Sequence, residues 1–247
     1  KVFSNNFDIG ACNQIDESLY GVVTKRREDV VDISQADFDV SLQSLDKSKW
    51  KMQTNFSFRP SQYSFQGSDE RLNNQIYEFH KAEGVESNKT GIIYGDGSTP
   101  LITAMLLFAK ENGFNEIKSI FPTYFMAHRI AYSINMGLTP CNRSLTHENN
   151  YYLSLPKKRS FLILTDPIWT IGRAHSSELI AQVSSWQEKT GSLIFVDGAS
   201  SYISWKKDDH IEQTAKFNPD LTFRMICPTK ALGLHGLRFS YTLTPTK

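Results

Sequence analysis

The stretch Leu193-Ile194-Phe195-Val196-Asp197 indicates the fold class of this chain, because it is a continuous apolar run that ends in a carboxylate. An unbroken apolar run is typical of a strand that is covered on both faces of its sheet. Residues 161–164, Phe-Leu-Ile-Leu, form a second run of this kind. Between the two runs, residues 176–190 have an amphipathic pattern that ends at Gly191, which predicts a helix.

The alternation of strand and helix extends along the chain in both directions. Further apolar runs that predict strands are residues 91–94, 117–121, 221–227 and 237–243. Further helical patterns are residues 68–80, 100–112 and 124–136. Strands that alternate with helices favour an α/β domain with a mixed, mainly parallel sheet between helices. In such a sheet ligands bind at the carboxyl ends of the strands.

The composition argues against several classes of function. With 40% hydrophobic and 21% charged residues the chain of 247 residues resembles an ordinary globular protein, and its net charge of +1 favours neither nucleic acid nor an anionic membrane as a partner. We expect a cytoplasmic protein, because the chain has no signal-like start and no apolar run near the roughly 18 residues that span a bilayer. The cysteines Cys12, Cys141 and Cys227 have no metal-ligand spacing, so no metal centre is expected.

Residues 227–238, Cys-Pro-Thr-Lys-Ala-Leu-Gly-Leu-His-Gly-Leu-Arg, carry the clearest chemical signal. Lys230 follows a predicted strand, glycines stand three and six positions later, and Arg238 opens the next strand. Glycines allow the backbone to turn sharply and to approach a ligand closely. A lysine and an arginine that are brought together repel each other unless an anion, such as a phosphate, lies between them. Taken alone, the segment could also be a basic surface loop.

The segment resembles the S-x-S/T-K-x-x-G-L-x-G-x-R motif of class I and II aminotransferases, the fold-type I enzymes that use pyridoxal 5'-phosphate (PLP). The resemblance spans roughly residues 30–243. It implies that Lys230 forms a Schiff base with the cofactor and then acts as general base, and that Arg238 binds the cofactor phosphate. Cys227 stands where the family usually has a phosphate-binding serine, and a thiol is a poor hydrogen-bond donor.

Asp197 closes a predicted buried strand upstream of Lys230. A buried carboxylate is costly unless it is paired, and the protonated pyridine nitrogen of PLP is a suitable partner. The family has an aspartate at this strand end in the pattern D-x-x-Y, so the resemblance implies a catalytic role for Asp197. Ser200 stands at the tyrosine position, and Tyr202 follows two residues later. Seen alone, Asp197 could equally cap a turn.

Two further motifs concern the phosphate and the ring of the cofactor. Gly97, Ser98 and Thr99 precede a predicted helix, whose N-terminus suits a phosphate, although Ser and Thr in this position are often only caps. The family grips the PLP phosphate with a similar turn. Phe121-Pro122-Thr123-Tyr124 resembles the family's P-x-W/Y/F, and this implies that the ring of Tyr124 stacks on the pyridine.

Residues 62–72 resemble the family's Y-x-x-x-x-G-x-x-x-L-R, in which the tyrosine reaches the phosphate of the neighbouring subunit. The resemblance therefore implies that Tyr63 binds the cofactor across a homodimer with shared active sites. A surface aromatic in a loop is the alternative.

The clearest departure from the family is residues 166–172, Asp-Pro-Ile-Trp-Thr-Ile-Gly, which stand where the family has N-P-x-N-P-T-G. Trp169 replaces the asparagine that hydrogen-bonds the phenolic oxygen of the cofactor, and indole cannot mimic that amide. Ser200 replaces the tyrosine that is the second usual partner. We therefore expect an altered ionisation of the bound cofactor, unless Tyr202 compensates.

The chain stops just after the strand that follows Arg238, whereas family members usually continue into a small C-terminal domain with the arginine that binds the substrate carboxylate. We expect residues 1–50 to form an N-terminal arm or edge segment and residues 51–247 to form the PLP-binding large domain, with the small domain absent.

The resemblance implies a PLP-dependent enzyme that acts on an amino acid, with transamination as the commonest outcome. A PLP lyase, cyclase or oxidase is an alternative, because the surroundings of the phenolic oxygen are altered. A second hypothesis is a non-catalytic or regulatory relative that keeps the fold. The chain has no G-x-G-x-x-G or G-x-x-x-x-G-K-[ST] motif, which argues against a generic nucleotide binder.

Overall fold

The computed structural model describes residues 70–85, 91–145, 151–169, 172–203, 214–232, 236 and 238–245, which all lie within one compact unit, Pro60–Lys247. The expected N-terminal arm, residues 1–50, and Tyr63 lie outside the described residues. None of the described helices is long and apolar enough to cross a membrane.

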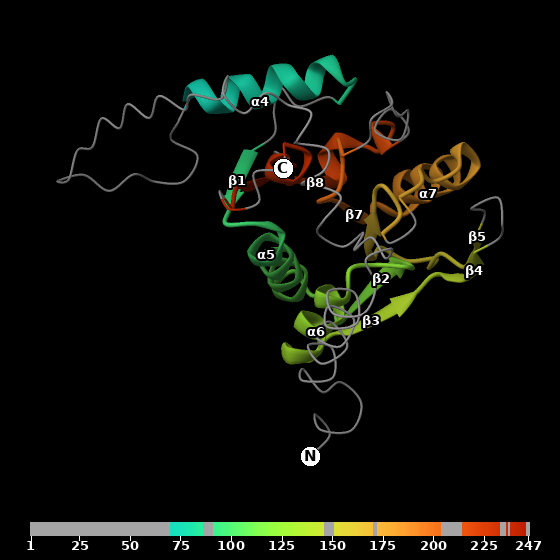
Figure 1. Ribbon diagram of the computed structural model, residues 1–247. Helices are drawn as coiled ribbons and strands as arrows, with labels where there is room; N and C mark the ends of the chain where they lie inside the picture. The colour runs from blue at the N-terminus through green and yellow to red at the C-terminus, as the bar shows by residue number, and fades with distance from the viewer. Residues whose placement is uncertain are drawn as a thin grey trace, which may run out of the picture. The chain divides into compact units, whose positions relative to one another are not determined.

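A seven-stranded sheet forms the centre of this unit (Figure 1). Its strands are β1 (Gly91–Gly95), β2 (Glu116–Ile120), β3 (Gly137–Pro140), β6 (Phe161–Thr165), β7 (Leu193–Gly198), β8 (Thr222–Ile226) and β9 (Ser240–Thr244). Their order in the sheet is β1-β9-β8-β7-β6-β2-β3. Strand β9 runs antiparallel to β1 and β8, and the other neighbours run parallel. The predicted α/β fold with a mainly parallel sheet is confirmed.

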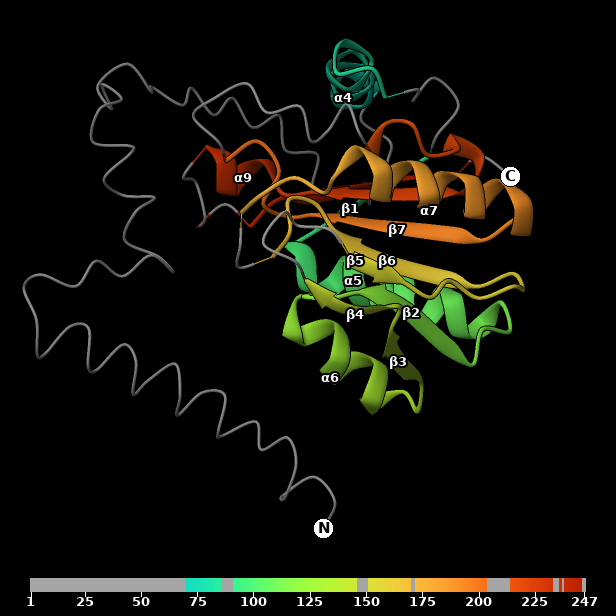
Figure 2. The ribbon, with the colours of Figure 1, turned by 90° about the vertical axis from the view of Figure 1, so that its right-hand side faces the viewer.

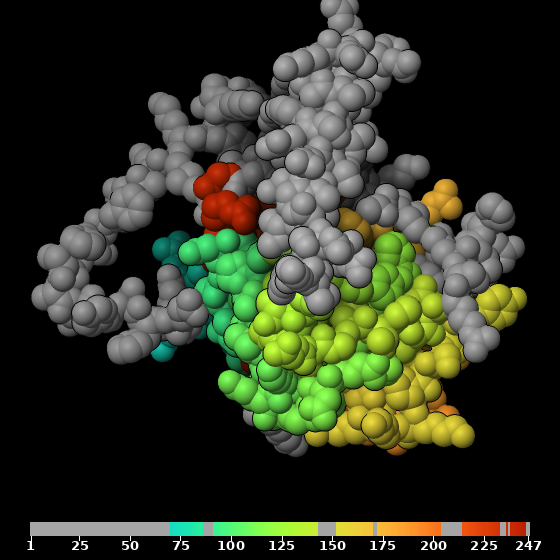
Figure 3. Space-filling model, turned by 90° about the horizontal axis from the view of Figure 1, so that it is seen from below, coloured from blue at the N-terminus to red at the C-terminus, as the bar shows by residue number. Residues whose placement is uncertain are grey.

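Helices cover both faces of the sheet. They are α4 (Glu70–Ala82), α5 (Ser98–Glu111), α6 (Phe125–Ser133), α7 (Ser177–Thr190) and the single turn α9 (Pro228–Ala231), with a short 3₁₀ helix, η2 (Pro219–Leu221). Figure 2 shows α7 on one side of the sheet and α5 and α6 on the other. In the space-filling view from below, the green side chains of α5 and α6 lie next to the yellow side chains that follow them in the sequence (Figure 3).

The end of α7 at Gly191 matches the sequence prediction, and Ser176, which the sequence placed in the helix, caps its start. The hydroxyl of Ser176 accepts a hydrogen bond from the backbone N–H of Leu179, and Gly191 ends the helix in the left-handed conformation. The sequence did not predict the three short strands between α6 and β6, which are β3 and the hairpin of β4 (Asn142–Leu145) and β5 (Tyr151–Leu153). These strands carry few apolar residues, so the periodic pattern that identifies a buried strand is missing from them.

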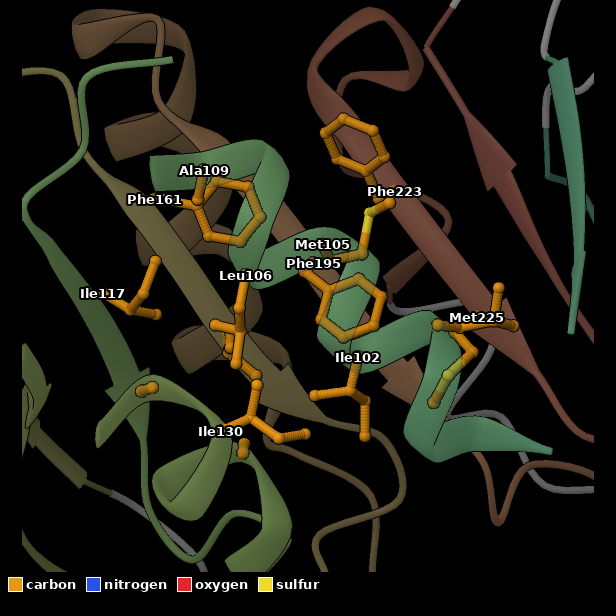
Figure 4. Close-up of a cluster of buried hydrophobic side chains, with 14 of the residues drawn as sticks. Ile102, Met105, Leu106, Ala109, Ile117, Ile130, Phe161, Phe195, Phe223 and Met225 are labelled. Atoms are coloured by element: carbon orange, nitrogen blue, oxygen red, sulfur yellow. The ribbon is translucent and has the colours of Figure 1, made fainter. Parts of the chain in front are cut away.

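The apolar runs are buried on both faces because successive side chains of a strand point to opposite sides. On one face Phe161, Phe195 and Phe223 pack against Ile102 and Leu106 of α5 (Figure 4). On the other face the intervening residues of β6 and β7 pack against α7. Truncation of one of the buried phenylalanines to alanine should cost about 3–5 kcal/mol, as in other protein cores.

A third cluster lies between α4 and the strands β8 and β9, and a buried histidine of α4 contacts its member Tyr241. His80 is fully buried, and its Nε2 atom lies 2.9 Å from the hydroxyl of Tyr241. Burial, assisted by the positive charge of Arg224, lowers the pKa of His80 to about 3. His80 is therefore neutral in the folded protein at every pH above about 4.

This histidine predicts a loss of stability in mild acid. The unfolded chain takes up a proton on His80 near its ordinary pKa of 6.5, whereas the folded chain does so only near 3, so stability falls as the pH drops below 6.5. At pH 5 this group alone should cost roughly 2 kcal/mol. Urea unfolding at pH 7 and pH 5 measures the loss, which should shrink by that amount in His80→Gln. An unchanged loss in this variant would show that other groups cause the acid sensitivity.

Candidate functional site

The predicted site residues that the structure describes all lie at one edge of the sheet, where β1, β2, β6, β7 and β8 end and β9 begins. They are Gly97, Ser98 and Thr99 after β1, Tyr124 after β2, Trp169 after β6, Asp197 and Ser200 at the end of β7, Cys227 and Lys230 after β8, and Arg238 before β9. Parallel strands end at the same edge, so the topology brings together residues as distant in sequence as Gly97 and Arg238.

Gly97 lies directly against the guanidinium group of Arg238. A Cβ atom at position 97 would lie 2.9 Å from Cζ of Arg238 and nearer still to Nη2, so a larger residue would displace the arginine. Gly97 has a φ of 93°, which favours glycine, and it stands at the N-cap of α5. Arg238 also donates a long hydrogen bond of 3.5 Å from Nη2 to the carbonyl oxygen of Asp96. A cation is therefore held beside the start of a helix.

Ser240 fixes the turn between β1 and α5. Its buried hydroxyl lies 2.9 Å from the carbonyl oxygen of Gly95 and 2.7 Å from that of Gly97. The first N–H groups of a helix have no partner within the helix, and no side chain caps the N-terminus of α5. The turn thus combines free N–H groups, the positive end of the helix dipole and Arg238, an arrangement that suits a phosphate.

Tyr124 connects this turn to an aromatic group. Its side chain lies near that of Thr99, and burial raises the pKa of Tyr124 above its ordinary value. The ring of Trp169 meets the ring of Tyr124 nearly edge-on, with 5.8 Å between the centroids and 75° between the planes. Phe125 contacts both rings, at 4.8 Å from Tyr124 and 6.3 Å from Trp169. The structure therefore brings Tyr124 and Trp169 together.

Asp197 is a buried acid near the predicted lysine. Its side chain is only 3% exposed, and Oδ1 accepts a hydrogen bond of 3.1 Å from the backbone N–H of Ala199. Burial raises the pKa of Asp197, and the hydrogen bond from Ala199 and the positive charge of Lys230 oppose this shift. The carboxyl group therefore lies where a second cation would stabilise its ionised form.

Cys227 lies between Lys230 and the turn at the start of α5. Its thiol lies near the side chain of Ser98 and close enough to Lys230 to interact with its charge. Burial nevertheless raises the pKa of Cys227 to about 11. The side chain is therefore a neutral thiol at physiological pH, and a nucleophilic role is not expected.

The turn after β7 separates Ser200 from Tyr202. The N–H of Ser201 donates to the carbonyl oxygen of Gly198 at 3.0 Å, which closes a turn that contains Ser200. Tyr202 adopts a φ of 67°, and its ring packs against Phe79 of α4 at 5.0 Å in the third apolar cluster. Tyr202 is therefore held by the α4 cluster, so the compensating role considered for it from the sequence is not supported.

Sequence reasoning missed Ser240, for which the sequence offers no recognisable signal. It also missed Arg224, although a charged residue inside the apolar run 221–227 is a visible anomaly. In the part of the chain that the structure describes, no three His, Cys, Asp or Glu side chains gather as a metal site would require.

Comparisons with known proteins show the family and the fold of the chain. The family model for aminotransferase class I and II matches residues 37–247. No curated protein gave a significant match. Three solved structures illustrate the similarity. The aminotransferase AspB from Helicobacter pylori 26695 has a TM-score of 0.60 at 18% identity, over 85% of this chain and 56% of its own. The aromatic aminotransferase from Pyrococcus horikoshii OT3 has a TM-score of 0.61 at 17% identity, over 75% and 51%. The PLP-bound C-S lyase from Staphylococcus hominis has a TM-score of 0.54 at 15% identity, over 71% and 51%.

The chain spans about half the length of these solved structures, and at such identities the likeness shows the fold alone. The family model covers most of the chain and matches the segments that form the strand-end site. By that match, this chain belongs to the aminotransferase class I and II family.

Proposed function

We propose that this chain is the cofactor-holding part of a PLP-dependent, aminotransferase-like enzyme, in which Lys230 bonds the cofactor as a Schiff base. The observation that carries the proposal is the convergence of three features at one sheet edge. These are the lysine that follows β8, the buried carboxylate of Asp197, and the Gly97–Arg238 turn at the start of α5.

Each part of PLP would meet a residue of suitable chemistry in this site. Arg238 and the N-terminus of α5 would hold the phosphate, because a cation and free N–H groups lie together there. Tyr124 would lie against the pyridine ring. Asp197 would face the ring nitrogen, whose proton would compensate a carboxylate that burial otherwise disfavours. Lys230 would meet the aldehyde carbon.

PLP bound in this way supplies an electron sink for the negative charge that develops on the Cα atom of an amino acid. The protein contributes the proton transfers and the electrostatics. The Nζ atom of Lys230 would be the general base for the proton on Cα. Asp197 would stabilise a proton on the ring nitrogen. The rings of Trp169, Tyr124 and Phe125 contact one another and would shield this side of the cofactor from water.

Membership of the aminotransferase class I and II family favours transamination over the PLP lyase, cyclase or oxidase considered from the sequence. The lysine, acid and arginine are all retained, which favours an enzyme over a non-catalytic relative.

The remaining parts of the proposal concern the whole protein. We propose that residues 51–247 form the PLP-binding domain, that the substrate is an amino acid, and that the protein works in the cytoplasm. We also propose a homodimer in which Tyr63 reaches the phosphate site of the neighbouring subunit.

Labelling of Lys230 tests the proposed function. Borohydride reduction of the protein saturated with PLP should leave a pyridoxyl group on Lys230, located by peptide mass mapping. The variant Lys230→Ala should lose this label but still bind inorganic phosphate, because Arg238 and the turn at the start of α5 remain. Label spread evenly over surface lysines, or an unlabelled Lys230, would refute the proposal.

Gly97→Ala tests the phosphate end of the site. The added Cβ would displace the guanidinium of Arg238, so affinity for inorganic phosphate should fall by about tenfold, the equivalent of one charged hydrogen bond. Isothermal calorimetry measures this change. Gly113→Ala is the matched control, because Gly113 has a similar φ of 81° but open space around its Cα.

Both alanine variants should lose about 1–2 kcal/mol of stability from the left-handed backbone, and only Gly97→Ala should lose phosphate affinity. Equal phosphate affinity in the two variants would mean that Arg238 does not contribute to the site.

A further inference from the structure

Arg224 is a buried cation in the middle of an apolar strand. Every residue of β8 is buried, and the side chain of Arg224 is only 5% exposed. Burial lowers the pKa of Arg224, and the negative charge of Asp166 opposes this shift. Arginine stays protonated at neutral pH even so, and a buried guanidinium is costly unless its donors and its charge are compensated. The fold therefore requires partners for it.

Thr214 links this cation to a buried anion. Arg224 donates from Nη1 to the hydroxyl of Thr214 at 2.9 Å and from Nη2 to its carbonyl oxygen at 2.8 Å. The same hydroxyl donates to Oδ2 of Asp166 at 2.9 Å, and Asp166 is only 1% exposed. We call these three residues the Asp166–Thr214–Arg224 relay. One hydroxyl both accepts from the cation and donates to the anion, so its position depends on both.

The relay lies behind the candidate site, on the opposite face of the sheet. The side chain of Phe195 packs in the core on the α5 side. Asp197 stands two residues later on β7, so its side chain points to the same face of the sheet. Val196 belongs to the core on the α7 side, and Arg224 pairs with Val196 in the sheet. The side chain of Arg224 therefore points to the α7 side, whereas the neighbouring side chains of Phe223 and Met225 pack on the α5 side.

Asp166 connects the relay to the main chain of the site. Its N–H donates to the carbonyl oxygen of Asp197 at 3.0 Å, and its own carbonyl oxygen accepts from the hydroxyl of Ser201 at 2.8 Å. Trp169 follows Asp166 by three residues. The ends of β6 and β7, which carry the two residues assigned to the cofactor ring, are thus joined through Asp166.

We infer that Asp166, Thr214 and Arg224 are positioning residues, which hold Asp197 and Trp169 in place for the pyridine ring. This inference rests on the proposed function. The phosphate turn lies at the other side of the site, on β1, β9 and α5, and makes no use of the relay. The relay should therefore affect recognition of the ring and leave recognition of the phosphate unchanged, which a purely structural role would not do.

Thr214→Val cuts the relay with little change of shape, and Thr214→Ser keeps the hydroxyl as a matched control. We expect Thr214→Val to bind PLP roughly tenfold more weakly than Thr214→Ser, as when an outer partner of a metal ligand is lost. Both variants should bind inorganic phosphate as the wild type does. Calorimetry with PLP and with inorganic phosphate measures the two affinities, and thermal unfolding confirms that the variants are folded.

A second variant keeps the test decisive if Thr214→Val does not fold. The double variant Asp166→Ala with Arg224→Met removes both buried charges together, so neither is left uncompensated. It should show the same selective loss of PLP affinity.

Equal PLP affinity in folded Thr214→Val and Thr214→Ser would overturn the inference, and so would a parallel loss of PLP and phosphate affinity. Failure of the proposed function is distinguishable, because the wild type itself would then leave Lys230 unlabelled by PLP and borohydride. That result would overturn the inference as well.

Discussion

The carboxylate of Asp197 lies in the protein interior, at the end of a strand covered on both faces, where an ionised group is costly unless a cation faces it. One backbone N–H and the charge of Lys230 offset part of that cost, and the pKa of Asp197 remains raised. The arrangement is reasonable for a site that receives a positively charged ring. The burial that destabilises the ionised carboxylate also strengthens its attraction for that cation.

The two faces of the sheet hold their polar groups in different ways. On the α5 side, the groups that would meet PLP are held by hydrogen bonds to backbone carbonyl oxygens, such as that of Ser240 to Gly97 and that of Arg238 to Asp96. On the opposite side, the Asp166–Thr214–Arg224 relay fixes strand ends with buried charges. Breaking one partner of a buried pair usually costs more than the pair contributes, so such a relay tolerates little displacement. The buried charges on the α7 side therefore hold the strand ends rigidly, and this keeps the site residues at those ends in position.

The sequence predicted the sheet and most of the edge residues for a physical reason. Apolar runs such as residues 193–196 identify strands without tertiary information, and parallel strands must end at one edge. The position of Tyr202 could not be predicted, because it depends on the left-handed turn after β7 and on contact with Phe79 from a distant helix. Arg224 was likewise hidden, since the partner of a buried charge is known only after folding.

The replacement of an amide by Trp169 changes what the edge can offer to a cofactor. An asparagine there would donate a hydrogen bond, whereas the indole ring packs against Tyr124 and Phe125. Tyr202 does not supply a second donor there, because its ring packs against Phe79 in the α4 cluster. The site thus gains apolar surface where it loses donors. Charges in less polar surroundings interact more strongly, so in the proposed function control of the chemistry would rest more heavily on Asp197 and Lys230.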